Sequence, residues 1–336
     1  MRLLITGATS GLGRVAAETM LAEGIEVRAT GRDPVAGAAL RSMGAEFIAA
    51  DLPTLPREAW HRLLSGMDVV WHCAALSSPW GSSADFHAIN VVATQELLDA
   101  AGECGVARFV HVSTPGLYFD RRHHLDVEES WRATRFANDY VYTKALAEDA
   151  VQASTLRYPH TRFVILRPRA LFGPHDRAVL PRLMHLVRRG HGVLWLPRGG
   201  AALQDVTYTG NVVHAMRLAG TADVASGRVY NITNQQPIRL CDLIVGLFSG
   251  LQERIDIRPV PYALLRGLAS AMELTSAMTG REPLLTRYGA GVLNFDMTLS
   301  ARLAQQELGY LPPISLDTGV ALAADWFLCN GHDKSI

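Results

Sequence analysis

The sequence predicts an α/β protein with a doubly wound parallel sheet and a smaller C-terminal part. Short apolar strands alternate with helical segments up to about residue 165, which is typical of a parallel sheet covered by helices on both faces. A glycine-rich turn follows the first apolar run, Leu3–Ile5, and leads into a helix that begins near Leu12. After Pro174 the alternation becomes irregular. Together these observations indicate a Rossmann-type dinucleotide-binding sheet with a substrate-binding domain after it.

The elements follow in order along the chain. We expect a dinucleotide-binding domain over residues 1–167 and 205–235, and a substrate-binding domain over 168–204 and 236–330. The predicted strands of the main sheet are Leu3–Thr6, Glu26–Thr30, Phe47–Ala50, Val69–His72, Phe109–Val112 and Phe163–Arg167. In the second domain we expect helices at Val179–Arg189, Leu240–Leu251 and Pro261–Met278, and strands at Val193–Leu196 and Ile255–Pro259.

The turn after the first strand reads Thr-Gly-Ala-Thr-Ser-Gly-Leu-Gly over residues 6–13. Glycines let the backbone turn tightly and approach a phosphate, and the start of the following helix offers N–H groups and a positive dipole end. The strand and helix on either side favour a phosphate-binding loop over an ordinary turn. The residues of this region expected to contact a dinucleotide are Gly7, Thr9, Ser10, Gly11, Leu12, Gly13 and Arg14.

The end of the second strand bears on the choice of cofactor. NAD-binding units usually place a carboxylate there for the ribose hydroxyls, but Gly31 stands at that position and Arg32 follows it. An arginine suits a 2′-phosphate, and Arg14 offers a second contact. We therefore expect NADP, with NAD as the alternative if Arg32 is merely a solvated residue and Asp33 serves the ribose.

The third strand ends just before Asp51. We expect Asp51 and the neighbouring Leu52 to lie at the adenine, where the carboxylate can accept a hydrogen bond from the amino group. The competing interpretation is that Asp51 caps the next helix.

A second motif concerns proton transfer. Tyr140 and Lys144 are four residues apart in a run of helix formers, so they share one helix face. An ammonium nearby favours the phenolate and lowers the pKa of a tyrosine, which is otherwise near ~10. The fifth strand leads into Ser113 and Thr114, and a hydroxyl at this strand end can bond a carbonyl oxygen while Tyr140 donates a proton.

With these motifs the chain resembles the extended short-chain dehydrogenase/reductase superfamily. The similarity covers most of the length and includes His72–Ala75, Asn90–Thr94, Leu166–Pro168, Asp205–Asn211 and Tyr230–Thr233. It implies that Thr114 is the catalytic hydroxyl beside Tyr140 and Lys144, and that Lys144 also holds the nicotinamide ribose. It also implies that Ala74, Ala75, Asn90 and Pro168 belong to the cofactor site.

Within the superfamily the chain looks most like the 3β-hydroxysteroid dehydrogenase branch, which includes 2-alkyl-3-ketoacid reductases. The cues are Pro79–Gly81 and the tail segments Arg281–Arg287 and Leu308–Pro312. Dehydratases of the superfamily carry an acid pair where this chain has Pro115 and Gly116. Many epimerases carry an asparagine where it has Ala170.

These features predict an NADP(H)-dependent oxidoreductase that interconverts a ketone or aldehyde and an alcohol on a small hydrophobic substrate: steroid-like, β-keto acid or aromatic. One alternative is a sugar-nucleotide 4-epimerase that retains NAD, since it uses the same Tyr/Lys pair. A second alternative is a nonenzymatic NADP sensor, although such proteins usually lose the tyrosine or the lysine.

The composition argues against several other classes of protein. Lys+Arg and Asp+Glu are equal at 32 each in 336 residues, which argues against nucleic-acid binding. We expect no signal peptide and no membrane span. We expect no metal site, since His123–His124 is read as a solvated loop. The four cysteines are scattered, which favours a cytoplasmic location. The loop 118–139 and the apolar stripe of 262–278 are expected near the substrate. The stripe could cap a hydrophobic ligand or rest on a membrane surface, although core packing or a dimer contact is the commoner role of such a stripe. The resemblance implies a homodimer formed through helices 84–104 and 140–158.

Overall fold

A seven-stranded parallel sheet forms the centre of the protein. The computed structural model describes residues 1–176 and 180–330, and within them the strands lie in the order β12-β7-β5-β4-β1-β2-β3. The strand order reverses between β1 and β4, the place where open α/β sheets bind ligands beyond the carboxyl ends of their strands. The strands are β1 (Arg2–Thr6), β2 (Glu26–Gly31), β3 (Glu46–Ala49), β4 (Val69–His72), β5 (Arg108–Val112), β7 (Arg162–Pro168) and β12 (Arg228–Ile232).

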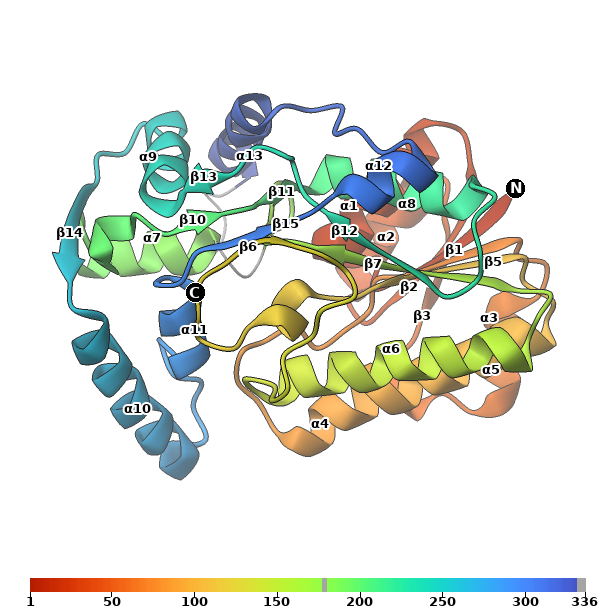
Figure 1. The fold of residues 1–336 in the computed structure, drawn as a ribbon. Coiled ribbons are helices and arrows are strands. Elements are labelled where there is room, and N and C mark those ends of the chain that lie inside the picture. The colour runs from red at the N-terminus through yellow and green to blue at the C-terminus, as the bar shows by residue number, and fades with distance from the viewer. Residues whose placement is uncertain (177–179, 331–336) are drawn as a thin grey trace.

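Helices cover both faces of this sheet (Figure 1). On one face lie α1 (Gly11–Ala22), α2 (Pro34–Ser42), α8 (Thr209–Thr221) and α12 (Arg302–Leu308), which share a buried apolar core with the strands. On the other face lie α3 (Arg57–Leu64), α5 (Ala93–Glu103) and α6 (Asp139–Arg157), which share a second core. The short α4 (Ser83–His87) contacts α6. The strands are therefore buried on both faces, which explains why their sequences are nearly continuous runs of apolar residues.

The remaining elements gather beyond one end of the sheet. They form a four-stranded sheet of β6 (His124–Val127), β10 (Leu203–Gln204), β13 (Ile238–Arg239) and β15 (Met297–Leu299), and two strand pairs: β8 (Leu171–Phe172) with β11 (Thr207–Tyr208), and β9 (Val193–Pro197) with β14 (Asp256–Val260). Their helices are α7 (Leu180–Arg189), α9 (Leu240–Gly250), α10 (Tyr262–Thr279), α11 (Arg287–Val292) and α13 (Leu316–Asn330).

The predicted fold class is confirmed, and the six predicted strands of the main sheet all form. Residues 228–232 return to the sheet as β12, beside β7. The predicted helix at 179–189 is observed from Leu180, and Val179 lies outside the described residues. The division into two domains stays a prediction.

Candidate active site

One cavity of about 440 Å³ lies at the carboxyl ends of the central strands. Its wall comes from the loop after β1, the ends of β2 and β3, the segment after β4 and the start of α6. It brings together residues that are far apart in the sequence. The sequence-predicted residues in its wall are Gly7, Thr9, Ser10, Gly11, Leu12, Gly13, Arg32, Asp51, Leu52, Ala74, Ala75, Thr114, Tyr140, Lys144 and Pro168.

The glycine loop is packed so closely that side chains are excluded. A Cβ added to Gly13 would lie 2.4 Å from the carbonyl oxygen of Gly7. Ser10 is the N-cap of α1, but its side chain makes no hydrogen bond to the first turn. The Gly11 N–H donates to the carbonyl oxygen of His175 at 3.2 Å. The start of α1 therefore meets the cavity as backbone, which is the arrangement that binds a phosphate.

Gly31 at the end of β2 is also constrained by its surroundings. A Cβ at this position would lie 2.5 Å from Oγ1 of Thr9. A side chain at residue 31, including the carboxylate that NAD-binding units place here, would therefore require Thr9 to shift. Asp33 accepts from the N–H groups of Val35 and Ala36 and so caps α2.

Arg32 and Asp51 face each other across the same end of the cavity. Their side chains are 69% and 49% exposed, and Nη1 lies 3.9 Å from Oδ1. This is a loose pair in which the guanidinium stays accessible. Asp51 makes no side-chain capping bond to the 3-10 turn that follows it.

The buried hydroxyls of Thr30 and Thr209 lie in the cavity wall and have no hydrogen-bond partner among the described residues. A buried polar atom without a partner is costly, so such atoms usually mark a ligand or an ordered water. Together with the glycine cradle, these hydroxyls fit a polar, phosphate-bearing dinucleotide.

Arg14 and Asn90 are not brought to the cavity wall as predicted. The Arg14 guanidinium is bound to Glu18 on the next helical turn, at 2.5 Å, and to the carbonyl oxygen of Ala36 at 2.8 Å. Asn90 is buried in a π-helical turn, and its amide binds both backbone groups of Leu76. Asn90 thus holds the segment after β4, which includes the cavity-lining Ala74 and Ala75.

Thr114 and Tyr140 meet at the end of β5. The Thr114 hydroxyl accepts from the N–H of Gly116 at 3.1 Å. Burial raises the pKa of Tyr140 to about 12, although a hydrogen bond with Thr114 acts in the opposite direction. The expected lowering of this pKa by Lys144 is not observed. Tyr140 is consequently protonated at neutral pH and able to donate a proton.

Lys144 is directed to the backbone and to a histidine. Its Nζ donates to the carbonyl oxygen of Val112 at 2.7 Å and lies 3.1 Å from Nε2 of His111. Burial holds the pKa of His111 well below 6.5, so the ring is neutral and can accept. Burial also lowers the pKa of Lys144 to about 8, although the Glu148 carboxylate raises it.

The Lys144→Met variant tests this buried ammonium. A lysine with a folded pKa of about 8 and an ordinary pKa of 10.5 opposes folding below pH 8 and loses that effect as pH rises to 10.5. The unfolding free energy of the wild type, relative to Lys144→Met, should therefore rise by about 3 kcal/mol across this window. Urea unfolding at pH 7 and pH 10.5 measures the difference, and a constant difference would contradict the lowered pKa.

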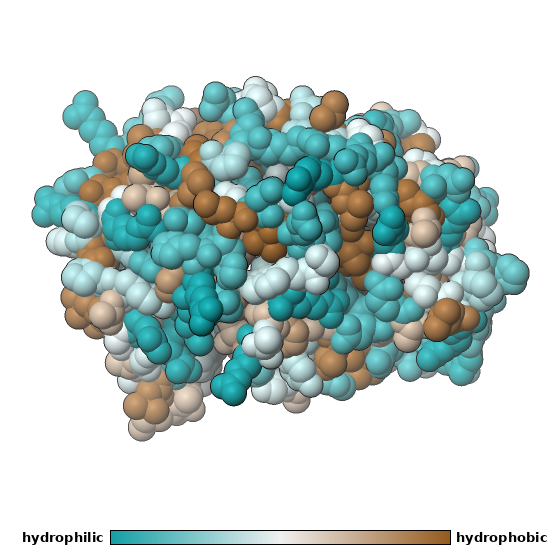
Figure 2. Space-filling view, viewed as in Figure 1, coloured by the Kyte–Doolittle hydropathy of each residue, from teal (hydrophilic) through white to brown (hydrophobic). Residues whose placement is uncertain are grey.

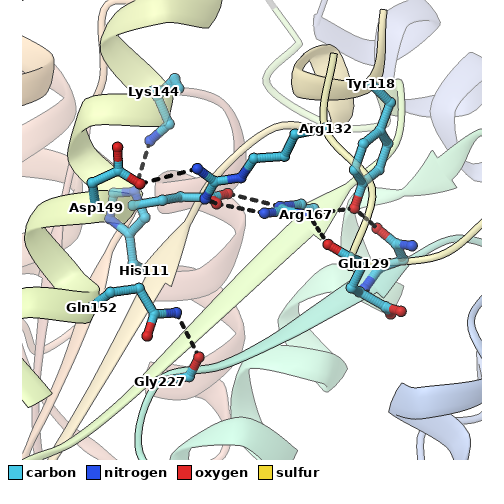
Figure 3. Close-up of polar contacts among 11 residues, drawn as sticks. His111, Tyr118, Glu129, Arg132, Lys144, Asp149, Gln152, Arg167 and Gly227 are labelled. Atoms are coloured by element: carbon cyan, nitrogen blue, oxygen red, sulfur yellow. Dashed lines mark hydrogen bonds and ion pairs between the residues drawn. The ribbon is translucent and has the colours of Figure 1, made fainter. Parts of the chain in front are cut away.

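A buried charge network fixes the helix that carries Tyr140 and Lys144 (Figure 3). Arg167 of β7, 1% exposed, donates from Nε and Nη2 to the two oxygens of Glu148 at 2.8 and 2.6 Å. Its Nη1 donates to the hydroxyl of Tyr118 at 2.6 Å and to the carbonyl oxygen of Glu129 at 2.9 Å. Because Glu148 is one turn beyond Lys144, this network ties the catalytic face of α6 to the sheet.

The segment 118–139 was expected to border the substrate, but none of its residues is in the cavity wall. Residues His124–Val127 of this segment form β6. His123 bonds Asp296 and His124 bonds Asp120, each through one ring nitrogen. No group of three metal-ligating side chains occurs in residues 1–176 and 180–330.

Sequence reasoning missed Tyr288 and His111. Tyr288 comes from α11. Its hydroxyl and that of Thr114 lie 3.1 and 3.3 Å from where a Cβ of Gly116 would be, so Tyr288 lies close to Thr114. No motif predicts it, because it reaches the site only through tertiary packing. His111 did carry a signal, since it precedes Thr114 by three residues on β5 and pairs in register with His72.

The model of the NAD dependent epimerase/dehydratase family matches residues 3–233, and the chain belongs to this family. It is 46% identical to the Uncharacterized protein YbjS of Escherichia coli K12, over 98% of this chain and 99% of that one. It is 33% identical to 4-hydroxy-2-methyl-3-oxo-4-farnesyl-3,4-dihydroquinoline-1-oxide ketoreductase of Stigmatella aurantiaca, over 95% of each. It is 30% identical to 2-alkyl-3-oxoalkanoate reductase of Stenotrophomonas maltophilia, over 95% and 97%.

Solved structures show the same fold. MoeE5 in complex with UDP-glucose and NAD superposes with a TM-score of 0.72 at 24% identity, over 97% of this chain and 98% of that one. The predicted superfamily and its 3β-hydroxysteroid dehydrogenase branch are confirmed by these relatives. The protein is an NAD(P)-dependent oxidoreductase acting on CH–OH or C=O groups of a small molecule.

Proposed function

We propose that the protein is an NADP(H)-dependent reductase of hydrophobic ketones or aldehydes, or the corresponding alcohol dehydrogenase. The observation that carries the proposal is the meeting of Thr114, Tyr140 and Lys144 in the wall of the cavity that the glycine loop closes. An acid, a hydrogen-bonding hydroxyl and a cation at one strand end suit proton transfer to a carbonyl oxygen.

Each of the three side chains has a separate role. Thr114 donates a hydrogen bond to the substrate carbonyl oxygen and polarises it, and Tyr140 transfers its proton to the same oxygen. Lys144 holds the nicotinamide ribose and so positions the cofactor against the substrate carbonyl. When bound, the nicotinamide supplies the hydride.

The preference for NADP rests on Gly31 and Arg32. Arg32→Ala should raise the dissociation constant for NADPH about 10- to 100-fold, because a charge-assisted hydrogen bond to the 2′-phosphate is lost, and should change that for NADH little. Tryptophan-fluorescence titration with each cofactor measures this. The exposed Arg62 gives a matched control, Arg62→Ala. Equal loss for NADPH and NADH, or none, would contradict the assignment.

The hydrophobic substrate class draws on the relatives, whose names include a farnesyl-quinoline ketoreductase, sterol-4-alpha-carboxylate 3-dehydrogenases and 2-alkyl-3-oxoalkanoate reductases. A screen of steroid-like, β-keto acid and aromatic ketones tests this substrate class, with the loss of NADPH absorbance as the measure of turnover. Turnover restricted to sugar nucleotides would overturn the proposal.

The epimerase alternative is not favoured, because several relatives with 30 to 33% identity are named as reductases or dehydrogenases. Ala170 also stands where many epimerases carry an asparagine. An epimerase should keep NAD through a desalting column, whereas a reductase should lose its cofactor.

We propose in addition that the enzyme is a cytoplasmic homodimer that pairs through α5 and α6. These helices pack side by side in the protomer, which leaves their outer faces available for a four-helix contact. The four cysteines form no disulfide, as expected in a reducing compartment. Sedimentation velocity tests the dimer.

A further inference from the structure

Helix α10 (Tyr262–Thr279) presents apolar side chains to solvent instead of to the protein. Its buried residues are the small Ala269 and Ser276. Its large apolar residues are outside, with Leu264 55%, Leu268 48%, Leu274 66% and Met278 81% exposed. A surface helix normally has the reverse pattern, with apolar residues inward and polar residues outward.

The exposed apolar residues form one stripe. At 3.6 residues per turn, Leu264, Leu268 and Met278 lie on one side of the helix, nearly opposite Ala269 and Ser276. Figure 1 shows α10 projecting from the body of the protein. Figure 2 shows apolar and neutral surface over its free end, at the lower left. Large exposed apolar surfaces usually mark an interaction site.

The charge around the stripe is positive. Among the exposed positions of α10 the one ionisable residue is Arg266, and Arg281 follows the helix; neither makes an ion pair within the described residues. The nearby carboxylates are already paired, Glu273 with Arg287 at 2.5 Å and Glu282 with Arg182. Arg266 lies on the side of the helix away from Leu264 and Leu268, as the polar face of an interfacial helix does. The unpaired charges of α10 and of the residue pair that follows it are thus cationic, which complements an anionic surface.

A second copy of the chain is a poor partner for this stripe. An 18-residue helix is about 27 Å long, and a stripe about 10 Å wide covers only about 300 Å². A stable interface needs about 800 Å² from each partner. A bilayer needs no matching shape, because leucine and methionine enter the acyl boundary and arginine binds lipid phosphate.

We propose that α10 lies flat in the interface of an anionic phospholipid bilayer, with Leu264, Leu268 and Met278 in the acyl region and Arg266 and Arg281 at the phosphates. The contact is with the surface only, since no described helix is long and apolar enough to cross a membrane. The docking stands independently of the proposed reaction.

The segment after α10 connects the proposed membrane contact to the active site. The segment after α10 reaches the wall of the active site: Glu282 accepts from the hydroxyl of Ser78 at 3.1 Å, and the neighbouring Ser77 lines the cavity. The next helix, α11, carries Tyr288 to the Thr114 end. If the proposed function holds, this contact places the membrane-bound helix on the same side of the protein as the segment after β4, which lines the active-site cavity.

Vesicle flotation tests the proposal on the full-length protein. Wild type should float with vesicles of phosphatidylcholine and phosphatidylglycerol at least about tenfold more than with phosphatidylcholine alone, and added salt should reduce the difference. Leu264→Gln/Leu268→Gln/Met278→Gln should abolish flotation. The matched control replaces three other exposed apolar residues, Val35, Leu156 and Leu311 (78%, 88% and 65% exposed), with glutamine and should float like wild type.

Three outcomes would overturn the proposal: no flotation of wild type, equal flotation of the α10 variant, or a loss of dimer in the α10 variant when neither protein floats. The last would identify α10 as a contact between copies, and sedimentation velocity detects it. NADPH titration of the variants shows that they are folded. Failure to reduce any ketone would refute the proposed function and leave the flotation result unchanged.

Discussion

Tyr140→Phe should lower kcat for ketone reduction about 100- to 10,000-fold, the usual contribution of a positioned general acid. The phenol is the one group we assign to proton donation, and its pKa of about 12 keeps it protonated. Phenylalanine preserves the ring, which lies 6.4 Å from that of Phe86. NADPH affinity, measured by fluorescence titration, should therefore change little.

The control is Tyr142→Phe. Tyr142 is two residues further along α6 and 50% exposed, so the same chemical change on the outer face should leave kcat unaltered. If Tyr140→Phe kept wild-type activity with intact cofactor binding, the assignment of the acid would be wrong.

Glu148→Gln should destabilise the protein by about 3–5 kcal/mol, because it leaves the buried guanidinium of Arg167 without its counter-charge. Glu148 is fully buried, and Arg132 also donates to it. The control is Asp149→Asn on the same helix. Asp149 is 61% exposed and pairs with Arg132 at 3.0 Å, so its loss should cost no more than about 1 kcal/mol. Urea unfolding at pH 7 compares the two variants.

The stabilisation that the Glu148–Arg167 pair provides has a defined pH dependence. Burial by itself raises the pKa of Glu148, but the hydrogen bonds and charge of Arg167 outweigh it and hold the pKa below 4.5. The stabilisation is therefore present above pH 4.5 and is lost as pH falls through the lower folded pKa. The difference in unfolding free energy between wild type and Glu148→Gln should therefore become smaller as the pH is lowered. A difference that grows in acid would show that the pKa of Glu148 is raised instead of lowered.

The local part of the architecture could be predicted from the sequence because each strand carries its own signal. The apolar runs and the glycine turn at 6–13 specify the main sheet without reference to distant contacts. The spacing of Tyr140 and Lys144 likewise places both on one helix face, and the structure brings both to the cavity.

The rest depends on tertiary contacts that no local pattern records. Arg14 follows the glycine loop but is turned away by Glu18, and Asn90 is occupied by Leu76. Tyr288 reaches the site from far along the chain through the packing of α11. The raised pKa of Tyr140 has the same origin, since burial and the direction of Lys144 are properties of the folded protein.

The close packing of Thr9 on Gly31 has an evolutionary consequence. The Cβ of any side chain at residue 31, including the acid that usually recognises NAD, would lie 2.5 Å from Oγ1 of Thr9 unless Thr9 shifted. The two positions are thus coupled. A switch of coenzyme along this route is easier when residue 9 becomes smaller as well.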